Sequence, residues 1–487
     1  MDLKAVLLSL AALPLVKTET VLGVFIFSRH GDRTPKALAP TNLTSLGAEQ
    51  VYGSGSYYRS RYVASNAASP ILGLDRDVAA LGQLSVTAPV DNVLQSSAQA
   101  FLQGLYPPVG RLSTQELRND TSVTAPLGGY QYVPVNIVTS ASTASNAENS
   151  AWLQGSSGCS NAVISSNNYL SSSEYASTYA ESEDFYASLL PVIDGVFDSE
   201  AANFKNAYAI FDYVNVATIH NKSIPSSDLL TDNTLRRLNM LADVHEWNLA
   251  FNSSDTIRAV AGATLAGQIM SALNATITGK GKVPLMNIQF GAYGAFSSFF
   301  GLAQLPAVSD DFMDVVDYAS SMAFELVTNA SITTTTTTTN YPSADEISVR
   351  FLFANGSAST ASPPTAYPLF GQSDTLLPWS RFVDEMARFA IHDTVDWCKA
   401  CGNSTGTCAA ANPNSSGSGS GSGSDASVSN SNNHGISLPV AGVIGALVTL
   451  AVVLGAEALI YLFSGLRLVK KSTLAAAAVQ ASAAAKA

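Results

Sequence analysis

Positive charge and histidine are both scarce in this sequence. Its 487 residues include 25 Lys and Arg against 37 Asp and Glu, with only five His, so the net charge is −12 and the pI is near 4.8. Because proteins that bind nucleic acid present clustered positive charge, this composition argues against nucleic acid as a partner. The acidity suits a secreted protein that stays soluble near neutral pH. The length is sufficient for one large domain with a subdomain and tails.

Cysteine is scarce too, which limits metal and redox chemistry. The four cysteines are Cys159, Cys398, Cys401 and Cys408. The Cys398-x-x-Cys401 pair could suggest a metal or redox site, but the chain has no second such pair and no nearby histidines suited to zinc. An even number of cysteines in an oxidising compartment predicts two disulfides, with three possible connectivities. We therefore predict disulfides and no metal site.

Each end of the chain carries a long apolar run. Residues 5–16 follow Lys4 and are too few to span a bilayer, so residues 1–17 read as a signal peptide, with a buried core helix as the alternative. Residues 439–463 are enough for a transmembrane helix. The basic residues that follow place the tail, residues 464–487, in the cytoplasm. We therefore expect a type I single-pass protein at the cell-surface membrane, with a GPI anchor as the alternative.

The segment before the transmembrane run, residues 411–438, is rich in Ser and Gly and is predicted to be a flexible stalk. Asn-x-Ser/Thr acceptors for N-glycosylation matter only in the secretory pathway, which agrees with the signal peptide. These acceptors are Asn42, Asn119, Asn221, Asn252, Asn274, Asn329, Asn355, Asn403 and Asn414.

The most informative stretch follows the short apolar run at residues 21–27. That run is rich in β-branched and aromatic residues, as in a strand buried on both faces. Arg29, His30 and Arg33 come directly after it, where α/β sheets bind their ligands. The two guanidinium groups suit a phosphate, and the imidazole can attack phosphorus. The alternative is that His30 caps the strand end and that both arginines are solvated at the surface.

The motif Arg29-His30-Gly31-Asp32-Arg33-Thr34-Pro35 resembles the signature of the histidine acid phosphatases, the branch of the histidine phosphatase superfamily that includes the fungal phytases. The resemblance covers roughly residues 19–408 and is close to secreted fungal members. The next segment is similar as well, in Leu43-Thr44-x-x-Gly47-x-x-Gln50, Gly53, Arg59 and Arg61-Tyr62.

The resemblance implies an α/β fold: a histidine-phosphatase (phosphoglycerate-mutase-like) sheet flanked by helices, with an inserted, mostly helical cap subdomain. The ectodomain would be residues 18–410 and the cap about residues 121–280. His30 would be the nucleophile, Arg29 and Arg33 would bind the phosphate of a small-molecule substrate, and no cofactor is implied.

Two catalytic positions depart from the family pattern. Asn92 stands where the family has a third arginine after the next strand, and we expect it to contribute only weakly to phosphate binding. Ala292 and Tyr293 stand where the family places its His-Asp proton donor. The His392-Asp393 pair has the same two residues as the family's donor motif, but it follows a helical pattern instead of a strand. The remaining candidate, His245-Glu246, lies within a predicted cap helix, where a satisfied structural pair is the favoured interpretation.

The coarse pattern predicts helices over residues 45–62, 95–106, 175–219, 228–252, 257–275, 295–302 and 378–390. It predicts strands over residues 84–93, 283–290 and 347–354. The sequence thus favours a membrane-anchored extracellular acid phosphomonoesterase that acts through a phosphohistidine, with a degenerate proton-donor position. The alternative is a non-catalytic protein of the same fold that binds a phosphorylated ligand or serves at the cell surface.

Overall fold

The computed structural model describes residues 19–138, 158–332, 340–405 and 408–409. Contacts divide the chain into Met1–Ser416 and Gly417–Ala487, and the second unit lies outside the described residues. The predicted signal peptide, stalk, transmembrane helix and cytoplasmic tail also lie outside them. Their assignment stays a prediction.

The apolar run that begins at Val21 forms β1 (Thr20–Arg29), the central strand of the sheet. It pairs in parallel with β6 (Met286–Gly291) and antiparallel with β7 (Ser321–Thr328). The eight-stranded sheet has the order β10-β8-β7-β1-β6-β2-β5, with β9 paired to β8. Since β1, β6, β2 and β5 are parallel, their carboxyl ends meet at one edge of the sheet.

Alternating side chains of β1 enter two cores, one on each face of the sheet. Phe25 and Phe27 pack in the core that α9, α10 and α11 cover, whereas Val24 and Ile26 pack on the side of α1 and α2. This α/β arrangement, a mixed sheet with helices on both faces, confirms the predicted fold class. The covering helices are α1 (Ser45–Tyr58), α2 (Asn92–Leu105), α9 (Val260–Thr278), α10 (Tyr293–Leu302) and α11 (Trp379–Met386).

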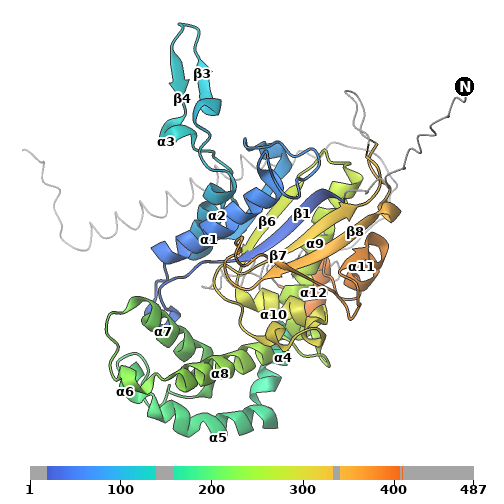
Figure 1. Cartoon of the computed structure of the whole chain (residues 1–487). Helices are drawn as coiled ribbons and strands as arrows, with labels where there is room; N and C mark the ends of the chain where they lie inside the picture. The colour runs from blue at the N-terminus through green and yellow to red at the C-terminus, as the bar shows by residue number, and fades with distance from the viewer. Residues whose placement is uncertain (1–18, 139–157, 333–339, 406–407, 410–487) are drawn as a thin grey trace, which may run out of the picture. The chain divides into compact units, whose positions relative to one another are not determined.

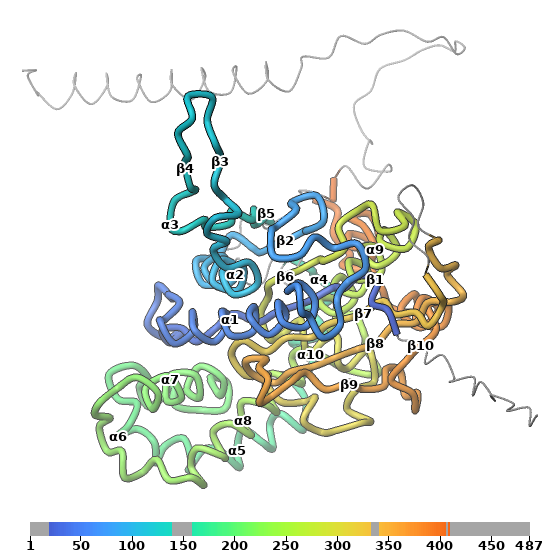
Figure 2. The backbone as a smooth tube through the Cα atoms, turned by 45° about the horizontal axis from the view of Figure 1, so that its top comes forward, coloured from blue at the N-terminus to red at the C-terminus, as the bar shows by residue number. Residues whose placement is uncertain are grey.

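Four further helices form a cap with a core of its own. Phe204, Ile210, Val214 and Leu238 are among its buried residues. In both views these helices lie together beside the sheet domain (Figures 1 and 2). The cap helices are α5 (Ser173–Ser188), α6 (Leu190–Ile193), α7 (Ala207–His220) and α8 (Asp232–Ala250).

The local predictions differ from the structure mainly at element boundaries. Strand β2 (Leu84–Pro89) ends earlier than predicted because Asp91 caps α2, its Oδ1 accepting the Leu94 N–H at 2.8 Å. Strand β8 (Ile347–Ala354) matches its predicted range, whereas β7 was not predicted at all. The remaining elements are β3 (Thr114–Glu116), β4 (Ser122–Thr124), α3 (Pro126–Gly129), β5 (Asn136–Val138), α4 (Ser160–Leu170), β9 (Thr365–Tyr367), β10 (Leu376–Pro378) and α12 (Thr394–Cys401).

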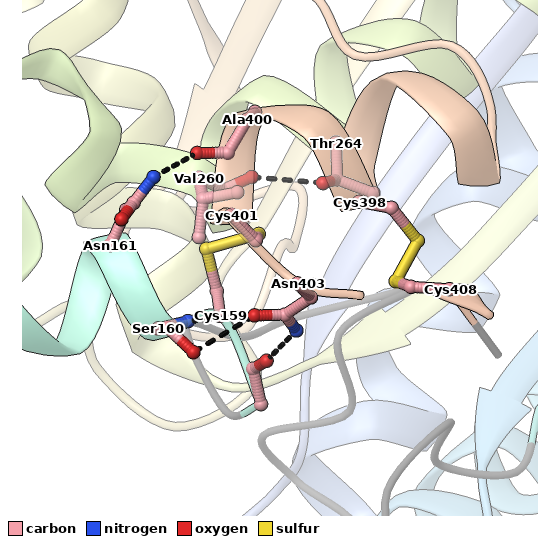
Figure 3. The surroundings of a disulfide bond; sticks show 11 residues. Cys159, Ser160, Asn161, Val260, Thr264, Cys398, Ala400, Cys401, Asn403 and Cys408 are labelled. Carbon is pink, nitrogen blue, oxygen red and sulfur yellow. Dashed lines mark hydrogen bonds between the residues drawn. A yellow bond between two sulfur atoms is a disulfide. The ribbon is translucent and has the colours of Figure 1, made fainter. Parts of the chain in front are cut away.

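One disulfide ties the C-terminal end of the domain to the start of α4, and a second lies within that C-terminal end (Figure 3). Cys159 is bonded to Cys401 across 242 residues of sequence, and Cys398 is bonded to Cys408. The two members of the Cys398-x-x-Cys401 pair are therefore joined to other partners and not to each other. No cysteine among the described residues is free.

One helix in the described part of the chain is long and apolar enough to cross a membrane. It comprises residues 256–278, which include α9. Of its most apolar 18-residue stretch, 72% is buried inside the domain. Since Leu265, Ile269 and Leu273 of this helix pack in the same core as β1, it is a core helix of the sheet domain.

Candidate active site

The carboxyl end of β1 carries the residues predicted to bind phosphate. Its ladder with β6 ends at the pair Arg29 and Gly291, and the chain continues as a loop. We call residues 29–35 the signature loop. Because β2 and β6 run parallel to β1, the residues that follow those strands face the same sheet edge.

Helix α1 and its N-cap residue Thr44 hold the signature loop from one side through polar contacts to Asp32. The Thr44 hydroxyl caps α1. The backbone N–H of Thr44 donates to the Asp32 carbonyl at 3.0 Å. The Gln50 Oε1 accepts the Asp32 N–H at 2.8 Å. The similarity of residues 43–50 to the family pattern thus has a physical basis, because this segment shapes the loop.

Two glycines allow the loop and α1 to approach this closely. A Cβ atom on Gly31 would lie 2.1 Å from the Gly47 carbonyl oxygen, and one on Gly47 would lie 2.0 Å from the Asp32 oxygen. Only a residue without a side chain fits at either position. From the other side, the Ser97 hydroxyl of α2 accepts the Gly31 N–H at 3.2 Å.

His30 is oriented by its own loop. Its Nδ1 lies 2.8 Å from the Gly31 carbonyl oxygen. A carbonyl can only accept, so Nδ1 carries the proton and the lone pair of the ring is on Nε2. The side chain is 1% exposed, and the Tyr318 ring lies 5.6 Å from the imidazole between centroids. This is the tautomer that a nucleophilic Nε2 requires.

Arg33 forms a buried ion pair with the cap. Its Nη2 lies 2.9 Å from Asp212 Oδ1, and its Nη1 donates to Oδ2 at 3.1 Å. The two side chains are 0% and 2% exposed. Burial alone would lower the pKa of the guanidinium, but Tyr208 and the Asp212 carboxylate raise the pKa above its ordinary value. Arg33 therefore stays charged and is paired.

Arg29 is surrounded by aromatic rings. Its guanidinium lies 4.7 Å from the ring centroid of Tyr318 and 5.3 Å from that of Tyr293. It also donates to the Val316 carbonyl and, at 3.3 Å, to the Tyr208 hydroxyl. Burial raises the pKa of Tyr208, so its hydroxyl stays protonated and neutral.

The end of β6 has an apolar residue followed by a tyrosine. Ala292 precedes α10 and offers no side-chain hydrogen bond. The Tyr293 hydroxyl donates to Glu246 Oε2 at 2.6 Å, and Glu246 Oε1 lies 2.8 Å from His245 Nδ1. Burial, followed by the charge of Glu246, raises the pKa of Tyr293 well above its ordinary value. Tyr293 is therefore a weaker acid than an ordinary tyrosine. The His245 and Glu246 side chains therefore contact each other, as expected for a structural pair.

Comparison with known families identifies the fold. The family model described as "Histidine phosphatase superfamily (branch 2)" matches residues 38–353, more than half of the chain. The chain belongs to branch 2 of the histidine phosphatase superfamily. The match begins at residue 38, just beyond the signature loop. No curated protein matches the sequence.

Solved structures with some likeness to this chain include phytases and an inositol polyphosphate phosphatase. The apo form of Hafnia alvei phytase is 14% identical, with 79% of this chain and 98% of that chain covered and a TM-score of 0.49. The phytase from Citrobacter braakii is 14% identical, with 79% and 99% covered and a TM-score of 0.49. The Bifidobacterium longum multiple inositol polyphosphate phosphatase, in complex with inositol hexasulfate, is 12% identical, with 79% and 95% covered and a TM-score of 0.47.

The other predicted site residues lie apart from the signature loop. Asn92 is the first residue of α2 and is exposed, and no hydrogen bond among the described residues joins it to the loop. His392 and Asp393 are also exposed. Asp393 caps α12, its Oδ1 accepting the Asp396 N–H at 2.9 Å. The structure therefore gathers Arg29, His30 and Arg33, but it does not bring His392-Asp393 to them.

Sequence reasoning missed the cap residues that contact the signature loop. Tyr208, Asp212 and His220 of α7 all do so, and His220 Nε2 lies 2.6 Å from Asp32 Oδ1. A signal was present for Asp212, because it is the single carboxylate in a largely apolar 14-residue helix. A charged residue in such a setting is normally buried with a partner.

An open cavity lies beside this closed cluster. It has a volume of about 290 Å³ and is lined by Lys36, Glu246, Arg258 and Tyr293, among other residues. Tyr293 thus borders both the cavity and Arg29. In the described part of the chain, no group of three or more His, Cys, Asp or Glu side chains could hold a metal ion.

Proposed function

We propose that this member of the superfamily is a phosphomonoesterase in which His30 carries the phosphoryl group. The observation that supports the proposal is the imidazole at the end of β1, with Nδ1 fixed by the Gly31 carbonyl and with Arg29 and Arg33 beside it. The two guanidinium groups would bind the oxygens of the transferred group and offset its charge.

The reaction would proceed in two steps that use these residues. His30 Nε2 forms a bond to phosphorus while the bond from phosphorus to the leaving oxygen breaks, which gives a phosphohistidine and an alkoxide or phenoxide. Water then attacks the phosphohistidine, releases inorganic phosphate and restores the imidazole. With Ala292 and Tyr293 at the family's donor position, the first step lacks an efficient acid for the leaving oxygen, which costs about 10²–10⁴ in rate.

We further propose that the enzyme acts on phosphorylated small molecules outside the cell, at acid pH. The apolar run at residues 439–463 would anchor it in the membrane, and the stalk at residues 411–438 would hold it above the surface. The nine glycosylation acceptors and the two disulfides support a route through the secretory pathway.

A second candidate is a non-catalytic member of the superfamily that binds a phosphorylated ligand. One observation favours it: the Tyr293 hydroxyl is committed to Glu246, so the donor position holds a group that is poorly suited to release a proton. Such a protein would retain the arginines as a receptor for phosphate.

Phosphate release from an aryl phosphate, measured across acid pH, decides between the two candidates. We expect the full chain, purified in detergent, to hydrolyse aryl phosphates faster than alkyl phosphates, because aryl leaving groups need little protonation. His30→Ala should abolish turnover, whereas the matched control His392→Ala should leave it unchanged, since His392 is exposed and outside the site.

Equal rates on aryl and alkyl phosphates would count against a missing donor. A folded protein that binds phosphate but releases none from either substrate would establish the receptor instead of the enzyme.

A further inference from the structure

The side of α7 that lies against the signature loop carries three polar residues. Tyr208, Asp212 and His220 are separated by four and eight residues, so they share one face of the helix. The Tyr208 hydroxyl accepts from both arginines of the loop, Asp212 pairs with Arg33, and His220 contacts Asp32. The cap therefore bonds to the residues that would bind phosphate.

Four donors converge on the Asp212 carboxylate. Two are the Nη1 and Nη2 groups of Arg33, at 3.1 and 2.9 Å. The others are the backbone N–H of Lys36, at 2.8 Å, and the Tyr318 hydroxyl, at 3.3 Å. A forked guanidinium, a main-chain N–H and a hydroxyl are also the donors that phosphate oxygens accept from. The carboxylate thus occupies an anion site of the kind that a phosphate needs.

We propose that Asp212 is an internal anion that competes with phosphate for Arg33, so that a substrate phosphate binds only when α7 withdraws. The inference rests on the proposed function, because it concerns the regulation of that same site. In the arrangement described here the site is closed: Arg29, His30 and Arg33 are 4%, 1% and 0% exposed.

The competing carboxylate comes from the cap and not from the sheet. Ile210 and Val214, which flank Asp212 on α7, pack with Leu238 in the separate core of the cap. The sheet residues around the loop pack with α1, α2, α9 and α10. The Arg33–Asp212 contact is therefore made between two cores and is internal to neither. An incoming phosphate can replace the lost partner of Arg33, which would otherwise remain a buried, unpaired charge.

The direct test is the binding of inorganic phosphate to the full chain and to Asp212→Asn. The amide keeps the shape of the side chain and removes its charge, so Arg33 becomes available to phosphate. Because the charged guanidinium of Arg33 can then donate to phosphate, we expect phosphate to bind Asp212→Asn at least about tenfold more tightly than the wild type. The matched control is Asp228→Asn, which removes the same charge from an exposed position of the cap. It should leave the phosphate affinity at the wild-type value.

A measurement on the unaltered protein keeps the test decisive if Asp212→Asn does not fold. Phosphate at saturation should accelerate hydrogen exchange of the α7 backbone amides, because the helix must release Arg33. Phosphate binding to the wild-type chain without a change in α7 exchange would overturn the inference.

The failure of this inference can be told from the failure of the proposed function. Turnover that depends on His30, together with equal phosphate affinity in the wild type and Asp212→Asn, would overturn only the role of Asp212. If neither protein binds phosphate and neither shows turnover that depends on His30, the proposed function fails and the inference fails with it.

Discussion

The ends of β1 and β6 lie side by side on the same sheet edge, yet they carry very different chemistry. At the end of β1, His30 has a defined tautomer and two guanidinium groups accompany it. At the end of β6, Ala292 offers no polar group and the Tyr293 hydroxyl faces Glu246. Under the proposed function, the end of β1 supplies the residues that would form a phosphohistidine, whereas the end of β6 lacks a group that would protonate the leaving oxygen.

In the proposed reaction, the nucleophile and the proton donor therefore depend on separate segments of the fold. The signature loop is fixed by Gly47 and Gln50 of α1 and by Ser97 of α2, none of which belongs to the β6 segment. Changes after β6 can therefore accumulate without disturbing the nucleophile. A site of this kind should favour substrates whose leaving groups need no acid.

The largest effect should come from placing a proton donor at the end of β6, so that both strand ends carry catalytic groups. In the double variant Ala292→His/Tyr293→Asp, the end of β6 regains an acid that can protonate the leaving oxygen. We expect hydrolysis of alkyl phosphates to rise by about 10² or more, with a much smaller change for aryl phosphates. Steady-state rates on one substrate of each class measure this.

The matched control for that double variant is Asn92→Ala at the end of β2. Because the Asn92 side chain is exposed and makes no bond to the loop among the described residues, the rates should change less than about threefold. An unchanged ratio of aryl to alkyl rates in a folded double variant would contradict the view that only the β6 end is deficient.

Any acid pH profile of the site must be separated from the pH dependence of folding, which Asp243 of α8 should influence. Burial raises the pKa of Asp243 to about 7. Because the pKa of Asp243 is higher in the folded than in the unfolded state, the folded protein holds this proton more tightly. The resulting stability is fully present below about pH 4 and is lost as the pH rises through about 7.

Asp243→Asn should remove this dependence, since the amide cannot ionise and its oxygen can still accept the Val315 N–H. We expect the variant to gain up to about 4 kcal/mol over the wild type between pH 4 and pH 7. Thermal midpoints of both proteins at a series of pH values test this. Parallel profiles would show that Asp243 does not titrate in this range.

Local patterns in the sequence were sufficient to predict the end of β1. The apolar run, the signature loop and the helix that starts at Ser45 all lie within forty residues, and their contacts are short in sequence. Strand β7 escaped prediction because Glu325 interrupts its apolar run. That carboxylate is buried and accepts from Arg61, Tyr62 and Arg350, partners that only the folded chain brings together.

The partner of Arg33 could not be predicted for the same reason. Asp212 lies 179 residues away and reaches Arg33 only because the cap packs on the signature loop. The disulfide pairing shows the same limit: Cys159 and Cys401 are 242 residues apart, and four cysteines leave three connectivities open. Contacts between the cap and the sheet depend on tertiary packing, which local periodicity does not report.

The most direct test of the account is a search for phosphate on His30 itself. The full chain would be mixed with an aryl phosphate, quenched at neutral or alkaline pH to preserve a phosphohistidine, and digested for mass spectrometry. We predict one phosphoryl group on His30 in the wild type and none in His30→Ala. Phosphate release that continues in His30→Ala, or turnover with no phosphorylated His30 at any time point, would contradict it.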